Sequence, residues 1–201
     1  MKITSREALR SLYVQPKGRA VAKQLDFLDA HCRKFISLSP FVVLASASAA
    51  MALDASPRGG EPGFVKVIGA NTLLLPDAPG NNRLDTLENI LQTGKLGLLF
   101  LIPGVDETLR VNGAAALSAD AAQLALFAHS RRPPKLVIEI TVAEAYLHCA
   151  KALMRAALWN PATQVDRSVL PSMGEMLKEQ TGSEAQAETQ AQMLVRYAED
   201  L

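Results

Sequence analysis

Short apolar runs, each followed by a turn that contains Gly, Pro or Asn, recur through the middle of this 201-residue chain. Two of them, residues 64–68 and 72–75, are separated only by Gly69-Ala70-Asn71, which is the pattern of a β-hairpin. We count about six such strands, mostly linked as hairpins, and this argues against an alternating parallel β-α-β design. The pattern favours a small antiparallel barrel with helices packed on its outside.

Further strands are predicted where β-branched and aliphatic residues cluster, at residues 41–45, 51–54, 96–102, 108–117 and 136–142. Residues 96–102 are almost entirely apolar, so we expect a central strand that is buried on both faces. Gly113, inside the strand that follows, predicts a bulge or a bend.

Helical spacing of apolar residues predicts helices at residues 18–38, 82–92, 119–129 and 144–158, and a polar helical tail over 172–201. Asn81 or Asn82 is the expected N-cap of the second helix. The chain therefore divides into an N-terminal helical extension (1–38), a β-rich domain (39–161) and a C-terminal helical tail (162–201).

The composition is that of a globular protein, with 49% hydrophobic and 20% charged residues. The net charge of +1 and the lack of a basic stripe argue against a nucleic-acid partner. The longest apolar run, residues 40–53, is shorter than the roughly 20 residues that span a bilayer, so we expect no membrane partner. Two widely spaced cysteines and a start without a signal-like apolar stretch lead us to expect a cytoplasmic location.

Two polar loops, residues 56–60 and 76–83, follow strand-like runs and carry fixed cations. Arg83 stands where the second loop opens a predicted helix, whose free amide groups and positive dipole end favour an anion. A guanidinium there adds a bidentate partner for phosphate oxygens. The alternative is an ordinary surface helix in which Arg83 pairs with Asp85 or Glu88.

Other cations leave the same two interpretations open. Lys66 interrupts an apolar strand, so it either points to solvent from an edge strand or meets an anionic ligand. Arg58 and Arg110 have the same alternatives, in a loop and on a strand respectively. The basic segment 131–135 is interpreted as a solvated turn.

No metal site or catalytic motif is predicted. The dipeptides His31-Cys32 and His148-Cys149 cannot chelate a metal by themselves, because neighbouring side chains point apart. Known nucleophile, zinc and nucleotide motifs are missing from the sequence. The residues by themselves thus indicate a barrel that binds an anion, with unspecified chemistry.

Five segments in order resemble the FMN-binding split-barrel proteins related to pyridoxamine 5′-phosphate oxidase. They are S-P-R-G (56–59), T-L-L-L-P-D through N-N-R-L-D-T-L-E-N (72–89), G-L-L-F-L-I-P-G (97–104), E-T-L-R-V-N-G (107–113) and A-Y-L-H-C-A-K-A-L-M-R through L-W-N-P (145–161). The resemblance covers about residues 35–161 and implies a split antiparallel β-barrel with flanking helices. It also implies a homodimer with FMN in each of two clefts at the subunit interface.

The resemblance implies a set of cofactor-binding residues: Arg58, Val65, Lys66, Asn82, Arg83, Thr108, Arg110, Lys151 and Trp159. Asn82 and Arg83 match the position where the family holds the phosphate. Lys66, together with the backbone of Val65, would lie on the strand along the isoalloxazine edge.

The other implied contacts come from more distant segments. Thr108 and Arg110 match strand positions near the flavin, and Arg58 would reach the phosphate or a substrate carboxylate. Lys151 and Trp159 would close the cleft from the other subunit. No catalytic residue is indicated.

The implied function is that of an FMN-dependent oxidoreductase acting on a small molecule, with a nicotinamide or another electron partner. The alternative is a non-catalytic flavin-binding or sensing module. The sequence departs from the family pattern in two turns, since Ala50-Met51-Ala52 replaces a Gly-containing turn and Gly60 stands where Asp is usual. The substrate-binding C-terminal pattern of the oxidase itself is not recognisable, which argues against oxidation of pyridoxamine phosphate.

Overall fold

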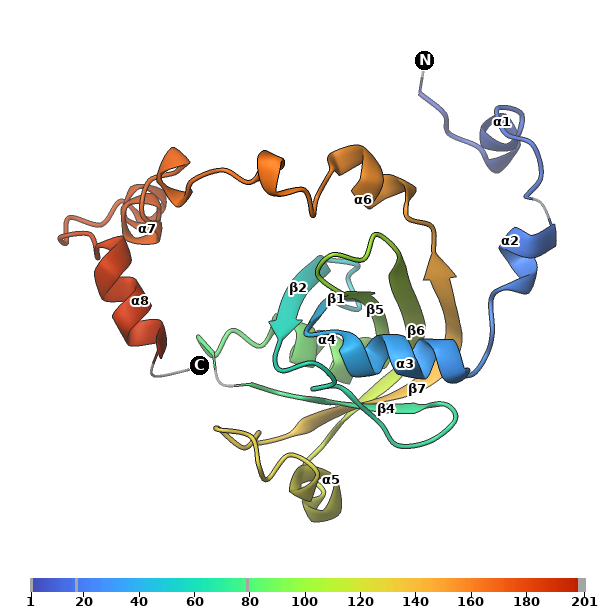
Figure 1. The fold of residues 1–201 in the computed structure, drawn as a ribbon, viewed down its shortest axis with the longest axis horizontal. Coiled ribbons are helices and arrows are strands. Elements are labelled where there is room, and N and C mark those ends of the chain that lie inside the picture. Colours follow the sequence, from blue (N-terminus) through green and yellow to red (C-terminus); the bar gives the residue numbers. More distant parts are fainter. Residues whose placement is uncertain (1, 17, 79, 199–201) are drawn as a thin grey trace.

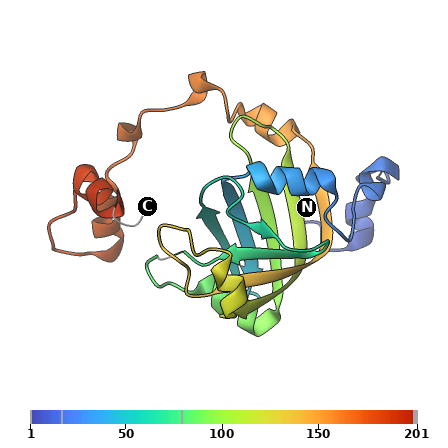
Figure 2. The ribbon, with the colours of Figure 1, turned by 60° about the horizontal axis from the view of Figure 1, so that its bottom comes forward.

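The computed structural model describes residues 2–16, 18–78 and 80–198. Its strands form one seven-stranded antiparallel sheet in the order β2-β1-β5-β6-β7-β4-β3 (Figure 1). The strands are β1 (Phe41–Ala47), β2 (Leu53–Gly59), β3 (Lys66–Val67), β4 (Thr72–Pro76), β5 (Lys95–Leu101), β6 (Thr108–Ser118) and β7 (Val137–His148). This is the predicted antiparallel architecture, and the sheet curls into an open barrel (Figure 2).

Helices cover the ends of the barrel and extend from both termini. They are α1 (Arg6–Arg10), α2 (Gly18–Ala22), α3 (Ala30–Leu38), α4 (Asp85–Thr93), α5 (Ala121–Ala125), α6 (Lys151–Ala156), α7 (Met173–Thr181) and α8 (Gln190–Ala198), with short 3-10 turns at Pro161–Thr163 and Arg167–Val169. Helix α3 lies across one end of the barrel and α4 lies at the other (Figure 2). None of the helices in the described ranges is both long and apolar enough to cross a bilayer.

Alternate residues of the strands build the core. Side chains on the inner face are almost fully buried, and they are joined by residues of α3 and α4: Val42, Leu44, Leu96, Leu98, Phe100, Leu109, Val111, Ile138, Ile140, Cys32, Ile36, Leu87 and Ile90. Burial of this apolar surface is the main force that holds the sheet and the two helices together. Burial also raises the pKa of the Cys32 thiol to about 12.

The bulge predicted at Gly113 is confirmed. The register between β6 and β7 shifts between Asn112 and Gly113. A Cβ atom on Gly113 would lie 2.1 Å from the carbonyl oxygen of Thr141, so the two backbones approach too closely for any other residue.

The prediction that residues 96–102 are buried on both faces is wrong. Inner-face residues of β5 are buried, but Leu99 on the outer face is 36% exposed, and its neighbour Leu101 is only half-buried. The reason is that α3 and α4 cover the ends of the barrel and leave the outer face of β1 and β5 bare.

The helix predicted over residues 18–38 is split in two. Between α2 and α3 the chain is extended, and Leu25 forms a β-bridge with Ala145 through hydrogen bonds of 3.0 and 2.7 Å. The helix predicted over 144–158 likewise begins only at Lys151, because β7 stays paired with β6 as far as His148. In both places pairing with the edge of β7 or with β6 overrides the local helical pattern.

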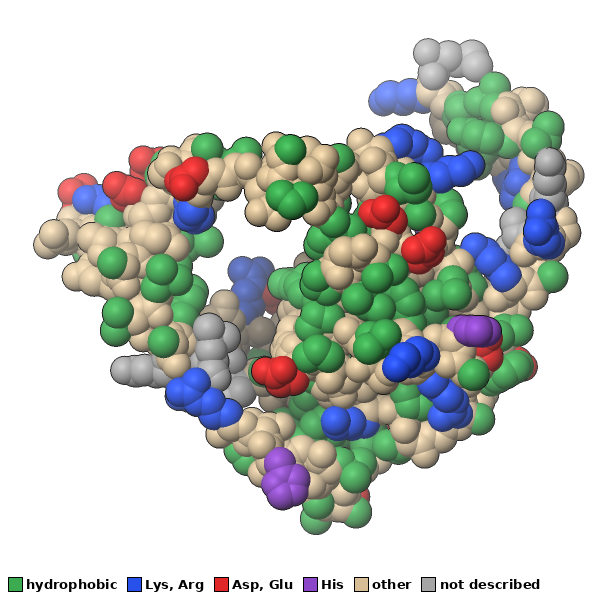
Figure 3. Space-filling view, in the orientation of Figure 1, with side chains coloured by type: hydrophobic (Ala, Val, Ile, Leu, Met, Phe, Trp, Pro, Cys, Tyr) green, Lys and Arg blue, Asp and Glu red, His purple; other side chains and the backbone are tan. Residues whose placement is uncertain are grey.

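The C-terminal tail is helical, as predicted, and it stands apart from the barrel. Helices α7 and α8 pack against each other, and space-filling atoms leave open space between this tail and the barrel (Figure 3). A capping box between Ser172 and Glu175 begins α7, and Arg196 pairs with Glu188 at 2.7 Å. The division of the chain at residues 38 and 161 stays a prediction, although core residues such as Cys32 precede the first boundary.

Candidate functional site

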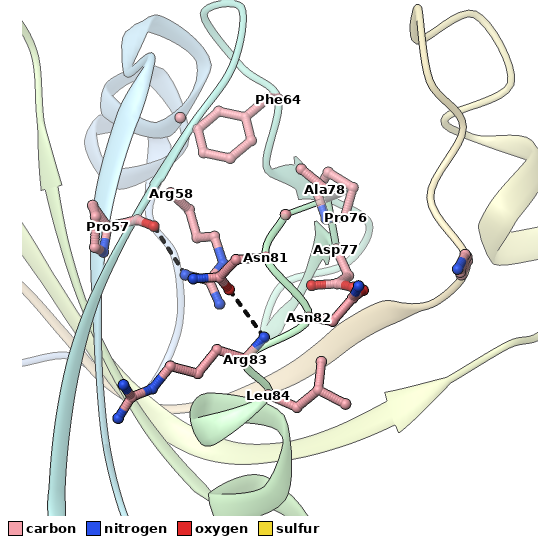
Figure 4. A pocket seen from close by; sticks show the side chains of 13 residues that line it. Pro57, Arg58, Phe64, Pro76, Asp77, Ala78, Asn81, Asn82, Arg83 and Leu84 are labelled. Atoms are coloured by element: carbon pink, nitrogen blue, oxygen red, sulfur yellow. Dashed lines mark hydrogen bonds between the residues drawn. The ribbon is translucent and has the colours of Figure 1, made fainter. Parts of the chain in front are cut away.

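The two polar loops singled out in the sequence lie side by side and enclose a cavity of about 390 Å³ (Figure 4). One wall is the end of the edge strand β2, and the other is the segment between β4 and α4. The lining residues are Pro57, Arg58, Gly59, Phe64, Pro76, Asp77, Ala78, Gly80, Asn81, Asn82, Arg83, Leu84 and Lys135. The structure therefore brings together Arg58, Asn82 and Arg83, three of the predicted cofactor ligands.

A tight turn leads from the cavity into α4. The side-chain oxygen of Asn81 accepts a hydrogen bond from the backbone N–H of Arg83 at 2.9 Å, and Asn82 has a φ of 57°. Asn tolerates this left-handed conformation better than most residues. The predicted Asn cap is wrong, because α4 starts later, after Leu84, and none of the described side chains caps it. Asn81 is occupied in forming the turn instead.

Three cations line the cavity. Arg58 extends between the two walls and donates to the carbonyl oxygen of Pro57 at 2.9 Å (Figure 4). Arg83 lies at the rim, and its Nε atom pairs with Asp85 at 2.5 Å, as the surface-helix interpretation expected. The terminal nitrogens of Arg83 form no hydrogen bond with the described residues, so they stay free for another acceptor. Lys135 is the third cation, from the turn before β7.

Lys135 was missed by sequence reasoning. It belongs to the basic segment 131–135 that was interpreted as a solvated turn. The pairing of β4 with β7, in register from Pro76 opposite Val137, carries this turn to the cavity. The one signal in the sequence was the density of cations just before a strand, which is too common to identify a site.

Asp77 is the only carboxylate among the described residues that line the cavity. Its backbone N–H donates to Leu136, but none of the described residues donates a hydrogen bond to its half-buried carboxylate. Burial raises the pKa of Asp77, and the charges of Arg58 and Lys135 oppose that rise in part. The cavity thus holds three cations and one poorly solvated acid, and its net charge favours an anion.

Beneath the cavity lies a polar cluster, which we call the Asp54 clamp: Ser46, Asp54, Ser56, Thr86 and Asn89. The carboxylate of Asp54 accepts hydrogen bonds from Ser46 (3.2 Å), Ser56 (2.7 Å) and Thr86 (2.5 Å), and Asn89 donates to Ser46 at 3.0 Å. Burial tends to raise the pKa of Asp54, but these hydrogen bonds and the charge of Arg58 outweigh it, and the pKa falls below its usual value. The clamp fixes α4 against β1 and β2.

Sequence reasoning missed the clamp as well. Thr86 and Asn89 are buried polar residues on the same side of α4 as the apolar Leu87 and Ile90. Polar residues at three-residue spacing among apolar ones were the available signal. Thr86 donates to Asp54, 32 positions away, and Asn89 donates to Ser46, 43 positions away, so only the fold brings these partners together.

The remaining predicted ligands do not line the cavity. Val65 is buried in the core, while Lys66 is exposed on the edge strand β3, as one of the two interpretations of it expected. On β6, Thr108 is buried and Arg110 donates to the hydroxyl of Tyr146 at 2.7 Å. Their role in cofactor binding stays a prediction.

Lys151 and Trp159 lie beyond the end of β7. Lys151 begins α6 and is exposed. Trp159 donates its indole N–H to the carbonyl oxygen of Val105 at 2.9 Å, which ties the start of the tail to the loop between β5 and β6. In the described part of the chain, no three His, Cys, Asp or Glu side chains gather closely enough to hold a metal ion.

Comparisons with known proteins agree with the barrel. A crystal structure of a HupZ variant from Group A Streptococcus is 16% identical, has a TM-score of 0.51, and covers 60% of this chain and 99% of its own. A putative pyridoxamine 5′-phosphate oxidase from Lactobacillus delbrueckii is 19% identical, with a TM-score of 0.49, and the match covers 62% of this chain and 98% of that protein. An FMN-binding protein from Syntrophomonas wolfei is 17% identical, with a TM-score of 0.43, and the match covers 58% of this chain and 83% of that protein. At 16% identity, the likeness to the HupZ variant concerns the fold alone.

Among curated proteins, none matches this chain. Residues 28–149, however, match the family described as pyridoxamine 5′-phosphate oxidase. That match spans more than half of the sequence and includes every strand of the sheet as well as the cavity. The chain therefore belongs to the pyridoxamine 5′-phosphate oxidase family, with the split-barrel fold of its relatives.

Proposed function

We propose that this protein binds FMN and that the FMN phosphate occupies the cavity between β2 and the start of α4. The observation that carries the proposal is the convergence of Arg58, Arg83 and Lys135 on one cavity beside a helix start that no described side chain caps. Guanidinium and ammonium groups are strong partners for phosphate oxygens, and free amides at a helix start add further donors.

The same cavity offers surface for a flat apolar ring. Phe64, Pro57, Pro76 and Leu84 stand among the cations, and the volume of about 390 Å³ lies within the range of small-molecule sites. The residues present therefore fit a ligand that combines a doubly charged phosphate with an aromatic ring system. Bound flavin supplies hydride or electron transfer, and the protein orients it and sets the charge around it.

We further propose that the flavin serves an oxidoreductase reaction on a small molecule, with a nicotinamide as the electron donor. Family membership supports this class of activity. A second candidate is a flavin-binding module without catalysis. It is favoured by one observation, which is that Asp77 is the only acid, His or Tyr among the described lining residues, so few groups there can transfer a proton.

The proposed functional unit is a homodimer in which a second copy covers the bare outer face of β1 and β5. Phe41 pairs across the strands with Leu101, and Val43 with Leu99, so four apolar side chains form one exposed cluster. Pro57, which lines the cavity, is the neighbour of Val43 on the other side. A subunit seated on this face would therefore also close the flavin cavity.

Replacing Leu99 by Glu tests the dimer. The charge would be buried unpaired in the interface, so the purified variant is expected to run as a monomer in light scattering while the wild type runs as a dimer. Glu at the exposed Leu91 on α4 is the matched control, and it should leave the mass unchanged. If the wild type runs as a monomer, the dimer proposal is wrong, but the proposal that the cavity binds flavin is unaffected.

The binding test compares FMN with riboflavin, which lacks the phosphate, by quenching of flavin fluorescence. The wild type is expected to bind FMN at least tenfold more tightly than riboflavin, since one charge-assisted hydrogen bond contributes roughly 1.5–3 kcal/mol. Arg58→Gln should remove most of that preference, and Arg83→Gln part of it. The control Lys95→Gln changes an exposed strand lysine that does not line this cavity, and it should bind as the wild type does. Equal affinity of the wild type for both flavins would contradict the proposal.

Anaerobic reduction separates the two functional candidates. If the protein is an oxidoreductase, the absorbance of its bound flavin should bleach when NADPH or NADH is added. Bleaching by dithionite alone would favour the non-catalytic module. Protein that remains colourless after incubation with excess FMN would exclude both.

A further inference from the structure

Net charge is distributed unevenly along the chain and lies mainly in two segments outside the barrel. Residues 2–19, which we call the basic arm, contain five Lys or Arg residues and one Glu, for a net charge of +4. Residues 172–201, which we call the acidic arm, contain six Asp or Glu residues and two Lys or Arg residues, for a net charge of −4. The residues between the arms carry only +1, and neither arm belongs to the family match over residues 28–149.

The basic arm offers apolar surface beside its cations. None of the residues of α1 is buried, and Leu12, Tyr13 and Val14, which follow it, are 63%, 66% and 91% exposed. A helix of five residues is unstable in water by itself, because its few hydrogen bonds do not offset the cost of nucleation. The arm therefore gains stability when another surface covers it.

The described part of the acidic arm is a defined helical hairpin. A Cβ atom on Gly174 would lie 2.1 Å from the carbonyl oxygen of Glu188, so the start of α7 packs very closely against the backbone that precedes α8. Leu177, Leu194 and Val195 are nevertheless 50%, 55% and 71% exposed. The hairpin thus keeps an apolar surface that the described residues do not cover.

The two arms cannot contact each other within one chain. They lie on opposite sides of the barrel in both ribbon views (Figure 1, Figure 2). The ion pairs among the described residues also leave Arg6, Arg10, Glu179 and Glu184 without partners. Opposite charges on two copies of the chain attract each other, and complementary charges of this kind fix the register of an interface.

We infer that, in the homodimer, the acidic arm of each subunit packs against the basic arm of the other. The exposed apolar residues of the two arms cover each other, and the arginines of α1 lie beside the glutamates of α7 and of the loop that follows it. A two-fold axis relates the two subunits, so the same contact forms twice.

A second copy of the chain is the partner that matches both arms. An anionic surface such as a membrane would attract the basic arm but repel the acidic arm, whereas a second copy supplies the opposite charge to each. The inference rests on the proposed homodimer only because it requires a second copy. It uses no residue of the flavin cavity.

Charge reversal in each arm tests the exchange, and sedimentation velocity of the full chain measures the dimer dissociation constant. Arg6→Glu with Arg10→Glu reduces the net charge of the basic arm from +4 to zero, and Glu179→Lys with Glu184→Lys does the same to the −4 of the acidic arm. Each dimer contains two such contacts. Each double variant should therefore raise the dissociation constant at least about tenfold, the factor that corresponds to 1.4 kcal/mol.

An equimolar mixture of the two double variants, at a concentration where each alone is monomeric, is the sharpest test. In a mixed pair, the new glutamates of one chain face the new lysines of the other, and the second contact is the native one. The mixture should therefore form dimers about as tightly as the wild type does. Mixing would not restore a contact that forms within one chain or with a different partner.

Lys34→Glu with Arg131→Glu is the matched control, because it makes the same change in net charge at two exposed residues outside the arms. It should dimerise as the wild type does. Circular dichroism reports whether each variant is folded, and the four arm residues that are changed are all exposed.

Unchanged dissociation constants in both arm variants would overturn the exchange and leave a homodimer through β1 and β5 standing. A mixture that stays monomeric would also overturn it. A wild-type monomer would overturn both the exchange and the dimer, whereas the FMN titration decides flavin binding separately.

Two other results would assign the arms to different partners and overturn the exchange. One is a mass that grows beyond that of a dimer as the concentration rises, because the arms would then join copies into open chains. The other is unchanged dimerisation of the basic-arm variant together with loss of binding to phosphatidylserine vesicles, which would assign that arm to a membrane surface.

Discussion

Two aspartates lie close to the candidate cavity, and their surroundings are opposite. Asp54, in the clamp, accepts hydrogen bonds from three hydroxyl groups, and its pKa is lowered. Asp77, in the cavity wall, receives no hydrogen bond from the described residues, and its pKa is raised. The clamp is satisfied by the protein itself, whereas the cavity holds charged groups with unused bonding capacity. This difference distinguishes the clamp, which supports the site, from the cavity, whose charged groups are available to a ligand.

One short segment of the sequence contributes residues both to the cavity and to the clamp. Arg83 and Thr86 belong to the same family-like segment, yet Arg83 is exposed at the cavity rim and Thr86 is buried in the clamp. Arg83 lies in the turn before α4, whereas Thr86 lies in the first turn of the helix on its buried side, so one segment serves both purposes. A substitution in it should therefore affect either stability or ligand affinity, according to its position.

The largest effect is expected from breaking the clamp. Asp54→Ala leaves three hydroxyl groups without their acceptor, and we expect a loss of about 3 kcal/mol in the free energy of unfolding. The measurement is the midpoint of urea unfolding. Glu88→Ala removes an exposed acid from α4 and should shift the midpoint little. If both variants unfolded at the same urea concentration, the clamp would not be what holds α4.

The second-largest effect is expected from Asp77, the cavity acid that receives no hydrogen bond from the described residues. Asp77→Asn removes a negative charge from a cavity proposed to hold phosphate, so FMN affinity at neutral pH should rise by about fivefold, or roughly 1 kcal/mol. Flavin fluorescence titration measures it. The gain should shrink as the pH falls, because the wild-type Asp77 then becomes protonated. A weaker affinity in the variant would mean that the carboxylate contacts the ligand favourably.

The two aspartates should also have opposite effects on the pH dependence of stability. The pKa of Asp54 is lower in the folded state than in the unfolded chain, so its contribution is complete above about pH 4 and is lost as the pH falls through the folded value. The pKa of Asp77 is raised, so the penalty of burying its charge is present above its folded value and is relieved as the pH falls.

Urea unfolding of Asp54→Asn and Asp77→Asn between neutral and acidic pH measures these contributions. Asp54→Asn should lose less stability on acidification than the wild type does. Asp77→Asn should lose more, because it lacks the relief. Identical pH profiles for the two variants would remove the electrostatic distinction between clamp and cavity.

The smallest effect lies in the turn between β1 and β2, next to the clamp. Met51 has a φ of 63°, in the left-handed region that favours glycine. Met51→Gly should therefore raise the free energy of unfolding by up to about 1 kcal/mol, since relief of strain exceeds the added flexibility of the unfolded chain. Met51→Ala keeps the strained conformation and should gain nothing. Thermal unfolding followed by circular dichroism is sensitive enough to distinguish them.

Local patterns were enough to predict the hairpin before β4, the bulge at Gly113, the antiparallel sheet and the two loops that meet at the cavity. Each of these depends on the conformational preferences of a few adjacent residues. The same patterns failed where a distant strand competed. Leu25 left its predicted helix to pair with Ala145, and residues 144–148 stayed in β7.

The site residues also fall into those that the sequence could identify and those that it could not. Arg58, Asn82 and Arg83 were identifiable because cations and amides beside turns are a local signal, and the resemblance to a family marked the same positions. Lys135 and the Asp54 clamp were not identifiable, because their members come from segments whose proximity depends on strand order and register. Short-range sterics and hydrophobic alternation specify elements, but charges become a site only when the packed sheet sets the distances between them.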